Sequence, residues 1–598
     1  MLDLNVCPAE DLFLRRRALR QELLAQPALQ DIRIAVLSGS TTEPFVAVLE
    51  LLLLHSGFRP TFHQGAYGRF YEEAIHDVEA LKAFAPQLVY LHTSSFNLQS
   101  RPALTCTEED LAVHVQNELA RWQEIWDSLE AQLGCIVIQN NFELPPVTVI
   151  GNLAASAPGG SSRFVAEMNR AFNLEAGRRP KLLLQDVHGV AASLGLGRWY
   201  DLTRFFSYKV LFTQDAHLAL ARSLAAIVRA VYSRSRKVLV LDLDNTLWGG
   251  VIGDDGVQGI QIGRETPQAE AYTAFQEYCL ALRSRGILLA VCSKNDEENA
   301  RSGFEHPDSV LKLDHISSFK ANWLPKHENL EAVAAELNLG LDSFVFVDDN
   351  PAEREIVRAQ LPMVAVPEVG KDVSEYPRAV EAGRYFEPAT LSSEDFARAG
   401  QYAANAERAG QAARFTDYGQ YLDSLEMQAE IALFTPIYLD RIAQLTNKTN
   451  QFNLTTRRYT LAEITALAAD PTRIPLYGRL ADRFGDNGLV SVVIGHLEND
   501  TVEIDLWLMS CRVLKREMEL AMLNALAAQA IARGATRLVG HYLPSAKNSM
   551  VAQLYPSMGF TPIPSPHSAI EGTTAWELSL AGFTPRTTHI QLLEPMYA

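Results

Sequence analysis

Short apolar runs that end abruptly in polar residues recur along this chain. Residues 238–241 are Val-Leu-Val-Leu, and Asp242, Asp244 and Thr246 follow at alternate positions. This pattern is typical of a strand buried on both faces of a parallel sheet, with its polar residues at the ligand-binding carboxyl end. Two carboxylates so close together predict phosphoryl transfer, in which one attacks phosphorus and the other moves a proton beside a divalent cation.

Two later segments repeat the pattern. The apolar run 286–292 leads into residues 293–295, Ser-Lys-Asn, whose hydroxyl and amide can hold phosphate oxygens. The run 343–347 leads into Asp348 and Asp349, which supply further acidic metal ligands. Hard carboxylate oxygens of this kind suit Mg²⁺. The sequence therefore predicts one site at the ends of three parallel strands.

A cation for the developing negative charge lies between these segments. Lys326 follows Trp-Leu-Pro and opens a predicted helix, while Lys294 and Lys320 are alternatives for the same role. Each piece has a simpler interpretation of its own, since a lone Asp-x-Asp is often a solvated turn and Asp348-Asp349 can cap a helix. Their order along the chain favours one shared site.

In this order, over roughly residues 236–370, the pieces resemble the haloacid dehalogenase (HAD) superfamily of aspartyl phosphatases. The resemblance implies that Asp242 is the nucleophile, Asp244 the general acid/base and Lys326 the stabilising cation. It also implies a set of binding residues. Substrate binding is expected from Thr246, Ser293, Lys294 and Asn295, and metal binding from Asp242, Asp244, Asp348 and Asp349.

The spacing between Asp242 and Ser293 leaves no room for the cap domain that many HAD enzymes carry. A turn-rich flap at 249–259 and one helix from about Pro267 to Arg285 fill it. A site without a lid is open to water. We therefore expect a substrate presented by something large, such as a carrier protein, or a site covered by a neighbouring domain.

Length and composition limit the remaining possibilities. A chain of 598 residues predicts three or four α/β domains, and 47% hydrophobic with 21% charged residues is ordinary for a globular protein. The net charge of −18 argues against nucleic-acid and anionic-membrane partners. With no apparent signal segment, and six cysteines that lack paired metal spacing, we expect a cytoplasmic protein.

Residues 1–232 are predicted to form an α/β unit, with strands at 32–37, 87–91 and 135–139. This unit resembles an SGNH-hydrolase-like domain, which implies Ser40 as nucleophile, Asn141 near the oxyanion position and Asp215 with His217 as the base pair. The family spacing is Asp-x-x-His and this chain has Asp-x-His. The alternative is a docking module in which Ser40 caps a helix.

After a phosphatase-like domain at 236–371, residues 372–420 are predicted to form a helical connector. The last unit, 421–598, has strands at 488–494 and 501–507 and a helix predicted from Leu514 to Arg533. This order resembles the α+β GNAT acyltransferase fold. Where that fold carries glycines before its long helix, this chain has Cys-Arg-Val-Leu-Lys-Arg, so a phosphopantetheine arm is favoured over acetyl-CoA.

Four motifs, at residues 242–253, 446–454, 509–513 and 547–548, together resemble the FkbH-like family. The resemblance implies a bifunctional enzyme of polyketide biosynthesis. Such an enzyme captures the phosphoglyceryl group of 1,3-bisphosphoglycerate as a thioester, dephosphorylates it and loads glyceryl onto an acyl carrier protein. Two alternatives stay open, namely a phosphatase fused to an acetyl-CoA-dependent acetyltransferase, or a carrier-binding scaffold with one live site.

Cys511 is the predicted thiol, because it lies just before the N-terminus of a predicted helix and basic residues follow it, and both features favour a thiolate. A buried structural cysteine is the alternative. His541 is a candidate base, and Arg512 and Asn548 are candidate substrate-binding residues. Carrier proteins are commonly acidic, so docking is expected at local basic clusters. These are Arg457, Arg458, Arg512, Lys515, Arg516 and Lys547.

Overall fold

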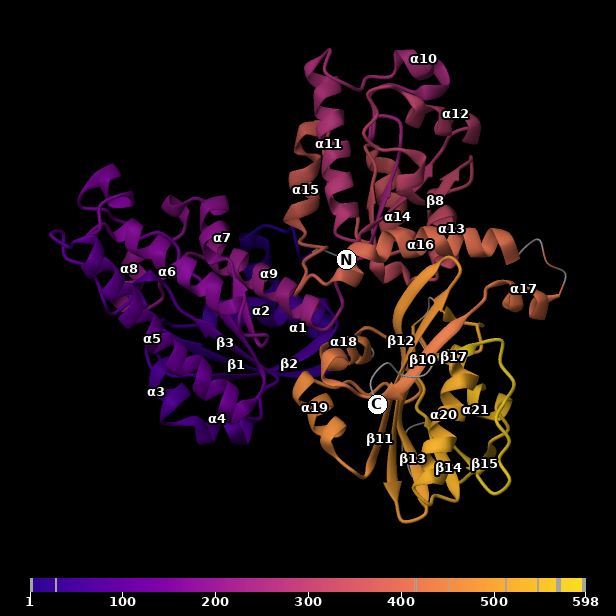
Figure 1. Cartoon of the computed structure of the whole chain (residues 1–598). Coiled ribbons are helices and arrows are strands. Elements are labelled where there is room, and N and C mark those ends of the chain that lie inside the picture. Colours follow the sequence, from indigo (N-terminus) through magenta and orange to yellow (C-terminus); the bar gives the residue numbers. More distant parts are fainter. Residues whose placement is uncertain are drawn as a thin grey trace. The chain divides into compact units, whose positions relative to one another are not determined.

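The computed structural model describes residues 4–26, 29–412, 415, 417–449, 451–510, 513–545, 548–565 and 572–593. The chain forms two compact units, and Figure 1 follows it through both. The first comprises Met1–Ser235 with Val380–Ala389, and the second comprises Arg236–Ala379 with Thr390–Ala598. Both units are of mixed α/β composition, as the sequence predicts. Among the described residues, no helix combines the length and apolar character needed to span a membrane.

The first unit is built on a parallel sheet with strand order β2-β1-β3-β4-β5. Alternate residues of β1 enter two separate cores, with Ile34 and Val36 on one face and Ala35 and Leu37 on the other. Helices α1, α2 and α9 cover the first face, and α5 and α6 the second. The strands are β1 (Gln30–Ser38), β2 (Phe58–Gln64), β3 (Leu88–His92), β4 (Ile136–Asn140) and β5 (Leu182–Gln185). The helices are α1 (Ala9–Leu24), α2 (Glu43–His55), α3 (Phe70–Ile75), α4 (Val78–Phe84), α5 (Glu108–Leu133), α6 (Ser161–Ala176), α7 (Val187–Leu194), α8 (Leu202–Tyr208) and α9 (Gln214–Val231).

Two histidines lie in the first core of this unit. His92 ends β3 and is 1% exposed, and His217 on α9 is 0% exposed. The ring of His92 stacks on Phe45, and that of His217 meets Phe212 edge-on. Burial, then the proximity of His217, lowers the pKa of His92 to about 3. Burial, then the charge of Arg204, lowers the pKa of His217 to about 4. Both histidines are therefore neutral in the folded protein at neutral pH.

We expect these histidines to make the first unit sensitive to mild acid. An unfolded histidine has a pKa of about 6.5, so below that pH the unfolded chain binds protons that the folded chain does not. The free energy of unfolding should fall by up to about 2 kcal/mol per histidine between pH 7 and 5. Denaturant titrations across this range measure it. His217→Leu should reduce the slope and exposed His188→Gln should not, whereas equal slopes in all three proteins would contradict the prediction.

The phosphatase-like part of the second unit has a parallel sheet of order β8-β7-β6-β9. Helices α13 and α14 pack on one face of this sheet. The strands are β6 (Val238–Leu241), β7 (Leu288–Ser293), β8 (Ile316–Ala321) and β9 (Phe344–Val347). The helices are α10 (Ile252–Gly259), α11 (Pro267–Ser284), α12 (Glu297–Ser302), α13 (Lys326–Leu337) and α14 (Pro351–Gln360).

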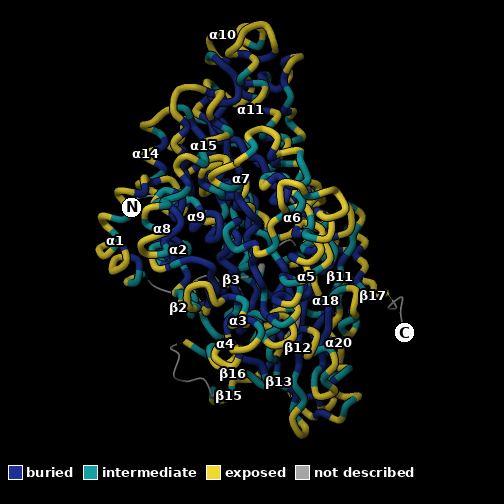
Figure 2. Tube along the Cα trace, turned by 90° about the vertical axis from the view of Figure 1, so that its left-hand side faces the viewer, coloured by how far each residue is buried: buried dark blue, intermediate teal, exposed yellow. Residues whose placement is uncertain are grey.

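Only α10 and α11 separate β6 from β7, so no cap domain is inserted there. The flap predicted to be turns contains the helix α10, in which Gly256 has φ 65° and breaks the regular geometry. Figure 2 shows α10 as mostly exposed. Further along the chain, the segment 372–420 is largely helical, with α15 (Tyr376–Ala382), α16 (Ser393–Ala412) and α17 (Tyr418–Ser424).

The C-terminal part is an eight-stranded mixed sheet of order β15-β16-β14-β13-β12-β11-β10-β17. Helices α18 and α19 contact one face, and α20 packs on the other. The predicted helix 514–533 begins later than expected, at Met518, because Lys515 and Glu517 both have positive φ. The strands are β10 (Gln428–Leu433), β11 (Arg473–Asp482), β12 (Gly485–Glu498), β13 (Thr501–Met509), β14 (Arg537–Tyr542), β15 (Thr561–Ile563), β16 (Thr574–Ser579) and β17 (Gln591–Leu593). The helices are α18 (Leu439–Lys448), α19 (Leu461–Ala469), α20 (Met518–Ala532) and α21 (Leu554–Ser557).

A short irregular segment joins two neighbouring parallel strands of this sheet, β13 and β14. β13 and β14 pair only from Thr501 to Ile504, and beyond that point residues 452–454 hydrogen-bond to both. Met509 N donates to Phe452 O and Leu454 N to Trp507 O on β13. Leu543 N, just after β14, donates to Leu454 O. We call residues 452–454 the wedge, because they lie between β13 and the end of β14 and hydrogen-bond to both sides.

Candidate functional site

Three carboxylates meet at the carboxyl ends of adjacent parallel strands. Asp242 follows β6, and Asp348 and Asp349 follow β9, whose last residue pairs with the last residue of β6. One oxygen from each lies within 4.8 Å of the others, close enough to hold a single metal ion. Asp242 Oδ1 is buried and has no hydrogen-bond partner in the described chain. A bound cation would satisfy this oxygen, so the residues present fit a metal.

Lys326 lies among these carboxylates as the first residue of α13. Its Nζ is 2.8 Å from Asp242 Oδ2 and 2.5 Å from Asp348 Oδ2, and its side chain is 3% exposed. Burial lowers the pKa of Lys326, but the two carboxylates outweigh burial and raise it overall. Burial, then repulsion by Asp242, raises the pKa of Asp348 to about 6 against the pull of Lys326. The lysine is therefore a permanent positive charge inside the site.

Asp244 is held by three donors. Its Oδ1 accepts hydrogen bonds from Trp248 Nε1 at 2.9 Å and Ile252 N at 3.0 Å, and its Oδ2 accepts one from Asn295 Nδ2 at 2.9 Å. Burial raises the pKa of Asp244, which suits a group that must carry a proton. Because both oxygens are engaged and the residue lies outside the three-carboxylate group, the predicted metal-ligand role of its side chain is not supported.

The loop after β6 turns sharply to bring these groups together. Asn245 adopts the left-handed conformation at φ 55°, which asparagine tolerates better than most residues, and its Oδ1 accepts a hydrogen bond from Gly250 N. Gly250 has φ 92°, a conformation that favours glycine. The turn returns the chain so that the Trp248 indole and the Ile252 amide both reach Asp244.

The four residues of this part that are predicted to bind substrate differ in burial and in hydrogen-bond partners. Ser293 ends β7, is 2% exposed, and its hydroxyl makes no hydrogen bond to the rest of the described chain. Thr246 is fully buried and accepts a hydrogen bond from Asp349 N, so it supports the backbone of the three-carboxylate group. Lys294 is ion-paired with Glu353 at 2.6 Å. Asn295 orients Asp244, as described above.

Sequence reasoning missed two residues of this site, Trp248 and Arg354. Arg354 on α14 is 2% exposed and donates hydrogen bonds to the carbonyl oxygens of Asp348 and Asp349, each at 2.8 Å. Its guanidinium is also ion-paired with Glu368. Arg354 thereby fixes the backbone that carries two carboxylates. The only sequence signal was an arginine in the first turns of the helix after them.

The residues predicted for acyl transfer lie in the C-terminal part or outside the described chain. Cys511 and Arg512 are outside the described residues, and the helix expected to begin beside them starts only at Met518. His541 on β14 is buried, with Nε2 2.7 Å from Glu503 Oε1. The Asn548 side-chain amide donates to the carbonyl oxygens of Asn453 and Leu543, so it holds the wedge in place.

Of the four predicted docking cations that the structure describes, three are engaged within the protein. Arg516 is 7% exposed and pairs with Asp482, so its assignment to a docking surface was wrong. Arg457 pairs with Asp505, and Arg458 donates a hydrogen bond to Asn447 O. Lys515 is exposed, and Lys547 lies outside the described residues.

The hydrolase triad predicted in the first unit is not assembled. Asp215 is ion-paired with Arg198 at 2.6 Å, while both ring nitrogens of His217 are buried without a hydrogen-bond partner in the described chain. Asn141 donates a hydrogen bond to Asp186. Ser40 does not cap α2 either, because the residue at the N-cap is Thr42.

Comparison with solved structures identifies one broad similarity. The chain is 28% identical, with a TM-score of 0.59, to the N-terminal part of the protein BF1531 from Bacteroides fragilis, which contains a phosphatase domain complexed with Mg. The match covers 64% of this chain and 100% of that chain. It shows that this chain contains a phosphatase-like fold of the HAD type.

Acetyltransferase structures match less closely. The ribosomal-protein-S18-alanine N-acetyltransferase from Escherichia coli is 12% identical over 27% of this chain and 99% of that chain. The GNAT domain of S. lividans PAT is 17% identical over 25% of this chain and 89% of that chain. Both have a TM-score of 0.21, too low to support an inference. No family model and no curated protein matches the sequence.

Proposed function

We propose that the phosphatase-like part hydrolyses a phosphomonoester through an aspartyl-phosphate on Asp242. The observation that carries this proposal is the buried Asp242 carboxylate, with one oxygen on Lys326 and the other without a hydrogen-bond partner in the described chain. An Asp242 oxygen attacks phosphorus, the ester P–O bond breaks, and Asp244 gives its proton to the leaving alkoxide. Water then attacks the phosphoaspartate and gives a proton to Asp244, which restores both residues.

Asp242, Asp348 and Asp349 are the residues that would hold Mg²⁺. When bound, the ion neutralises charge on the phosphoryl group and helps to orient it. Lys326 neutralises further negative charge that develops on the transferred oxygens. Arg354 keeps the Asp348–Asp349 backbone in place, and Asn295 and Trp248 keep Asp244 oriented.

Metal removal should abolish phosphate release. Without a divalent cation, the three close carboxylates repel one another, and no metal charge offsets that of the phosphoryl group. EDTA-treated protein should therefore lose nearly all activity. Added Mg²⁺ should restore it, and Ca²⁺, which prefers more ligands at longer distances, should restore much less. Phosphate release measured before and after metal addition tests this. Full activity in metal-free protein would exclude the proposed site.

The substrate we propose is a phosphoglyceryl thioester. In this proposal the chain takes the phosphoglyceryl group of 1,3-bisphosphoglycerate onto Cys511, removes the phosphate at Asp242 and passes glyceryl to the phosphopantetheine arm of an acyl carrier protein. The family-like motifs of the sequence support it, as does a phosphatase site without a cap. A polyketide pathway is the setting that the resemblance implies, and the cytoplasm is the expected compartment.

Mass spectrometry of the protein after exposure to 1,3-bisphosphoglycerate tests the acyl-transfer proposal. A covalent glyceryl or phosphoglyceryl adduct is expected, lost in Cys511→Ala and retained in Cys106→Ala, a matched change at a partly exposed free cysteine. Acetyl-CoA turnover without an adduct would instead support a fused acetyltransferase. Phosphatase activity with neither result would leave a scaffold with one live site.

A further inference from the structure

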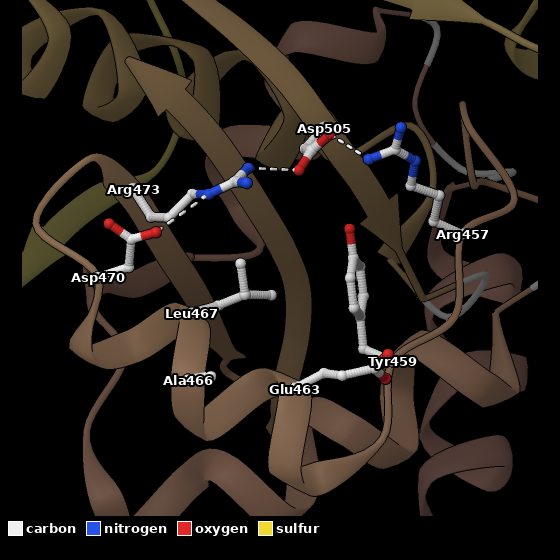
Figure 3. Close-up of a pocket in the computed structure, with 8 residues that line it drawn as sticks. All are labelled: Arg457, Tyr459, Glu463, Ala466, Leu467, Asp470, Arg473 and Asp505. Atoms are coloured by element: carbon white, nitrogen blue, oxygen red, sulfur yellow. Dashed lines mark hydrogen bonds and ion pairs between the residues drawn. The ribbon is translucent and has the colours of Figure 1, made fainter. Parts of the chain in front are cut away.

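The pocket shown in Figure 3 is neutralised by its own residues. It has a volume of about 330 Å³ and lies in the C-terminal part of the chain. Asp505 lies between Arg457 and Arg473 and is ion-paired with both, and Arg473 is also paired with Asp470. The charged groups of this pocket therefore satisfy one another without a ligand.

The exposed surface beside the carboxylate site is of a different kind, because it is apolar. Trp323 is 76% exposed and Leu324 is 53% exposed. The chain has seven tryptophans, all within the described residues, and the other six contribute to its cores. Five of those six are buried, and Trp576 packs against the C-terminal core. Trp323 thus leaves a large apolar ring in water, and tryptophan is enriched among the residues that dominate binding.

The strand register places these two residues at the rim of the carboxylate site. β7 and β8 end side by side, since Ser293 pairs with Ala321, and Asn322 N then donates to Ser293 O at 3.2 Å. The loop 322–325 leads directly into Lys326, whose Nζ lies among the carboxylates. The two apolar residues are therefore flanked along the chain and across the sheet by residues of the site.

The loop that carries Trp323 is held in place by side-chain hydrogen bonds. The side-chain amides of Asn322 and Asn329 bond to each other reciprocally, at 3.1 and 2.9 Å. Asn322 Oδ1 also accepts a hydrogen bond from Leu324 N at 3.0 Å, and Asn329 is buried on α13. These bonds fix the backbone on both sides of Trp323. A surface fixed in this way loses little conformational freedom when a ligand binds to it.

The rim and the carboxylate site call for opposite ends of one substrate. Residues 322–325 are Asn-Trp-Leu-Pro and carry no charge, whereas Lys326 and the metal-binding carboxylates suit a phosphoryl group. A second anionic group at the rim would lose hydration against an apolar surface. A substrate that fits both regions has a phosphoryl group at one end and an uncharged chain at the other.

We infer that Trp323 and Leu324 bind the uncharged thioester chain of the substrate while its phosphoryl group occupies the carboxylate site. This inference deepens the proposed function and rests on it, because it states what the uncapped site recognises besides phosphate. Trp323 is then a specificity-determining residue. It selects a thioester over a free acid that has the same phosphoryl end.

Phosphate release from two substrates with the same phosphoryl end tests this selection. One is the N-acetylcysteamine thioester of 3-phosphoglycerate, which ends in an uncharged chain, and the other is 3-phosphoglycerate itself. Trp323→Ala should raise KM for the thioester about tenfold or more with little change in kcat, because the lost contact is the same in the ground and transition states. The preference for the thioester should fall by the same factor.

Two further variants show whether the ring itself is responsible. Trp323→Phe keeps an apolar ring at the rim and should retain most of the preference for the thioester. Ile437→Ala removes a side chain that is 75% exposed, between β10 and α18, and should retain the preference in full. Both positions are exposed, so these substitutions should leave the fold intact.

Quenching of tryptophan fluorescence by acrylamide tests binding without turnover. In Asp242→Asn protein, quenching should act mainly on Trp323, because the other tryptophans are buried or packed against a core. The thioester should protect this fluorescence more than 3-phosphoglycerate does. In the double variant Asp242→Asn/Trp323→Phe, the readily quenched fraction and its protection should both be lost.

The inference is overturned if Trp323→Ala lowers kcat/KM for both substrates by the same factor, or if the thioester gives no protection. Stronger protection by glucose 6-phosphate than by the thioester would also overturn it, since a sugar stacked on the indole would then be the ligand. Failure of the proposed function gives a different result. Wild-type protein would then release phosphate from neither substrate, while quenching would still report whether the thioester reaches Trp323.

Discussion

Asp242→Asn should reduce phosphate release by about 10³-fold or more. A carboxamide cannot form the phosphoaspartate, and its nitrogen would face Lys326 Nζ or the position of the metal, where only an oxygen is favourable. The fold should survive, because the side chain keeps its size. Phosphate release from a phosphoglyceryl-loaded protein is the measurement, and capture of the phosphoglyceryl group should persist and accumulate.

Asp254→Asn is the matched control for this change. Asp254 lies on the exposed flap helix α10 and has the same chemistry without a place in the site, so its substitution should leave the rate unaltered. Wild-type phosphate release by Asp242→Asn would show that another residue is the nucleophile. A similar loss in both variants would point to disturbance of the flap.

Lys326→Met should lower both activity and stability. The substitution keeps the aliphatic stem but removes the charge between Asp242 and Asp348, leaving buried carboxylates without their counter-ion. Breaking such a pair costs about 3 kcal/mol or more of the free energy of unfolding. Loss of the cation that neutralises transferred charge should slow phosphate release by about 10²-fold or more. Denaturant titrations and phosphate assays measure the two effects.

Magnesium distinguishes this role of Lys326 from simple packing. With the lysine gone, no cation of the described chain is ion-paired with the Asp242 and Asp348 side chains, so Mg²⁺ should stabilise Lys326→Met more than it stabilises the wild type. Lys320→Met, which removes a partly exposed lysine paired with Glu336, is the control and should have little effect on either quantity. Equal stabilisation of wild type and Lys326→Met by Mg²⁺ would contradict this account.

The sequence located the phosphatase-like part well because its strands are buried on both faces. Uninterrupted apolar runs identify β6, β7 and β9, and parallel pairing then brings the residues after them to one edge. β8 was missed, because Ile-Ser-Ser-Phe-Lys-Ala lacks such a run. In the first unit β2 contains Pro60 and β5 has only four residues, so neither gives a clear strand pattern.

Contacts that depend on the path of a loop or on residues distant in the sequence could not be predicted. Arg354 acts on two backbone carbonyls and Trp248 on a carboxylate four residues before it, and neither contact follows from local periodicity. The burial of Arg516, in the loop before α20, depends on Asp482 at the end of β11, more than thirty residues away. β13 also contains a bulge, since it pairs Leu506 with Ile494 and then Ile504 with Gly495, which leaves Asp505 as an extra residue. The sequence does not reveal this bulge, because Val502, Ile504 and Leu506 keep an unbroken apolar alternation through it.

The wedge changes how the C-terminal sheet should open. Irregular segments usually exchange their amide hydrogens quickly, but the Leu454 amide is held by β13, and the amides of Met509 and Leu543 are held by the wedge. Opening this segment would release hydrogen bonds on both strands at once, so it cannot fluctuate independently of them. The two halves of the sheet, which share only a short parallel pairing, are thereby joined into one cooperative unit by a segment that is itself not a strand.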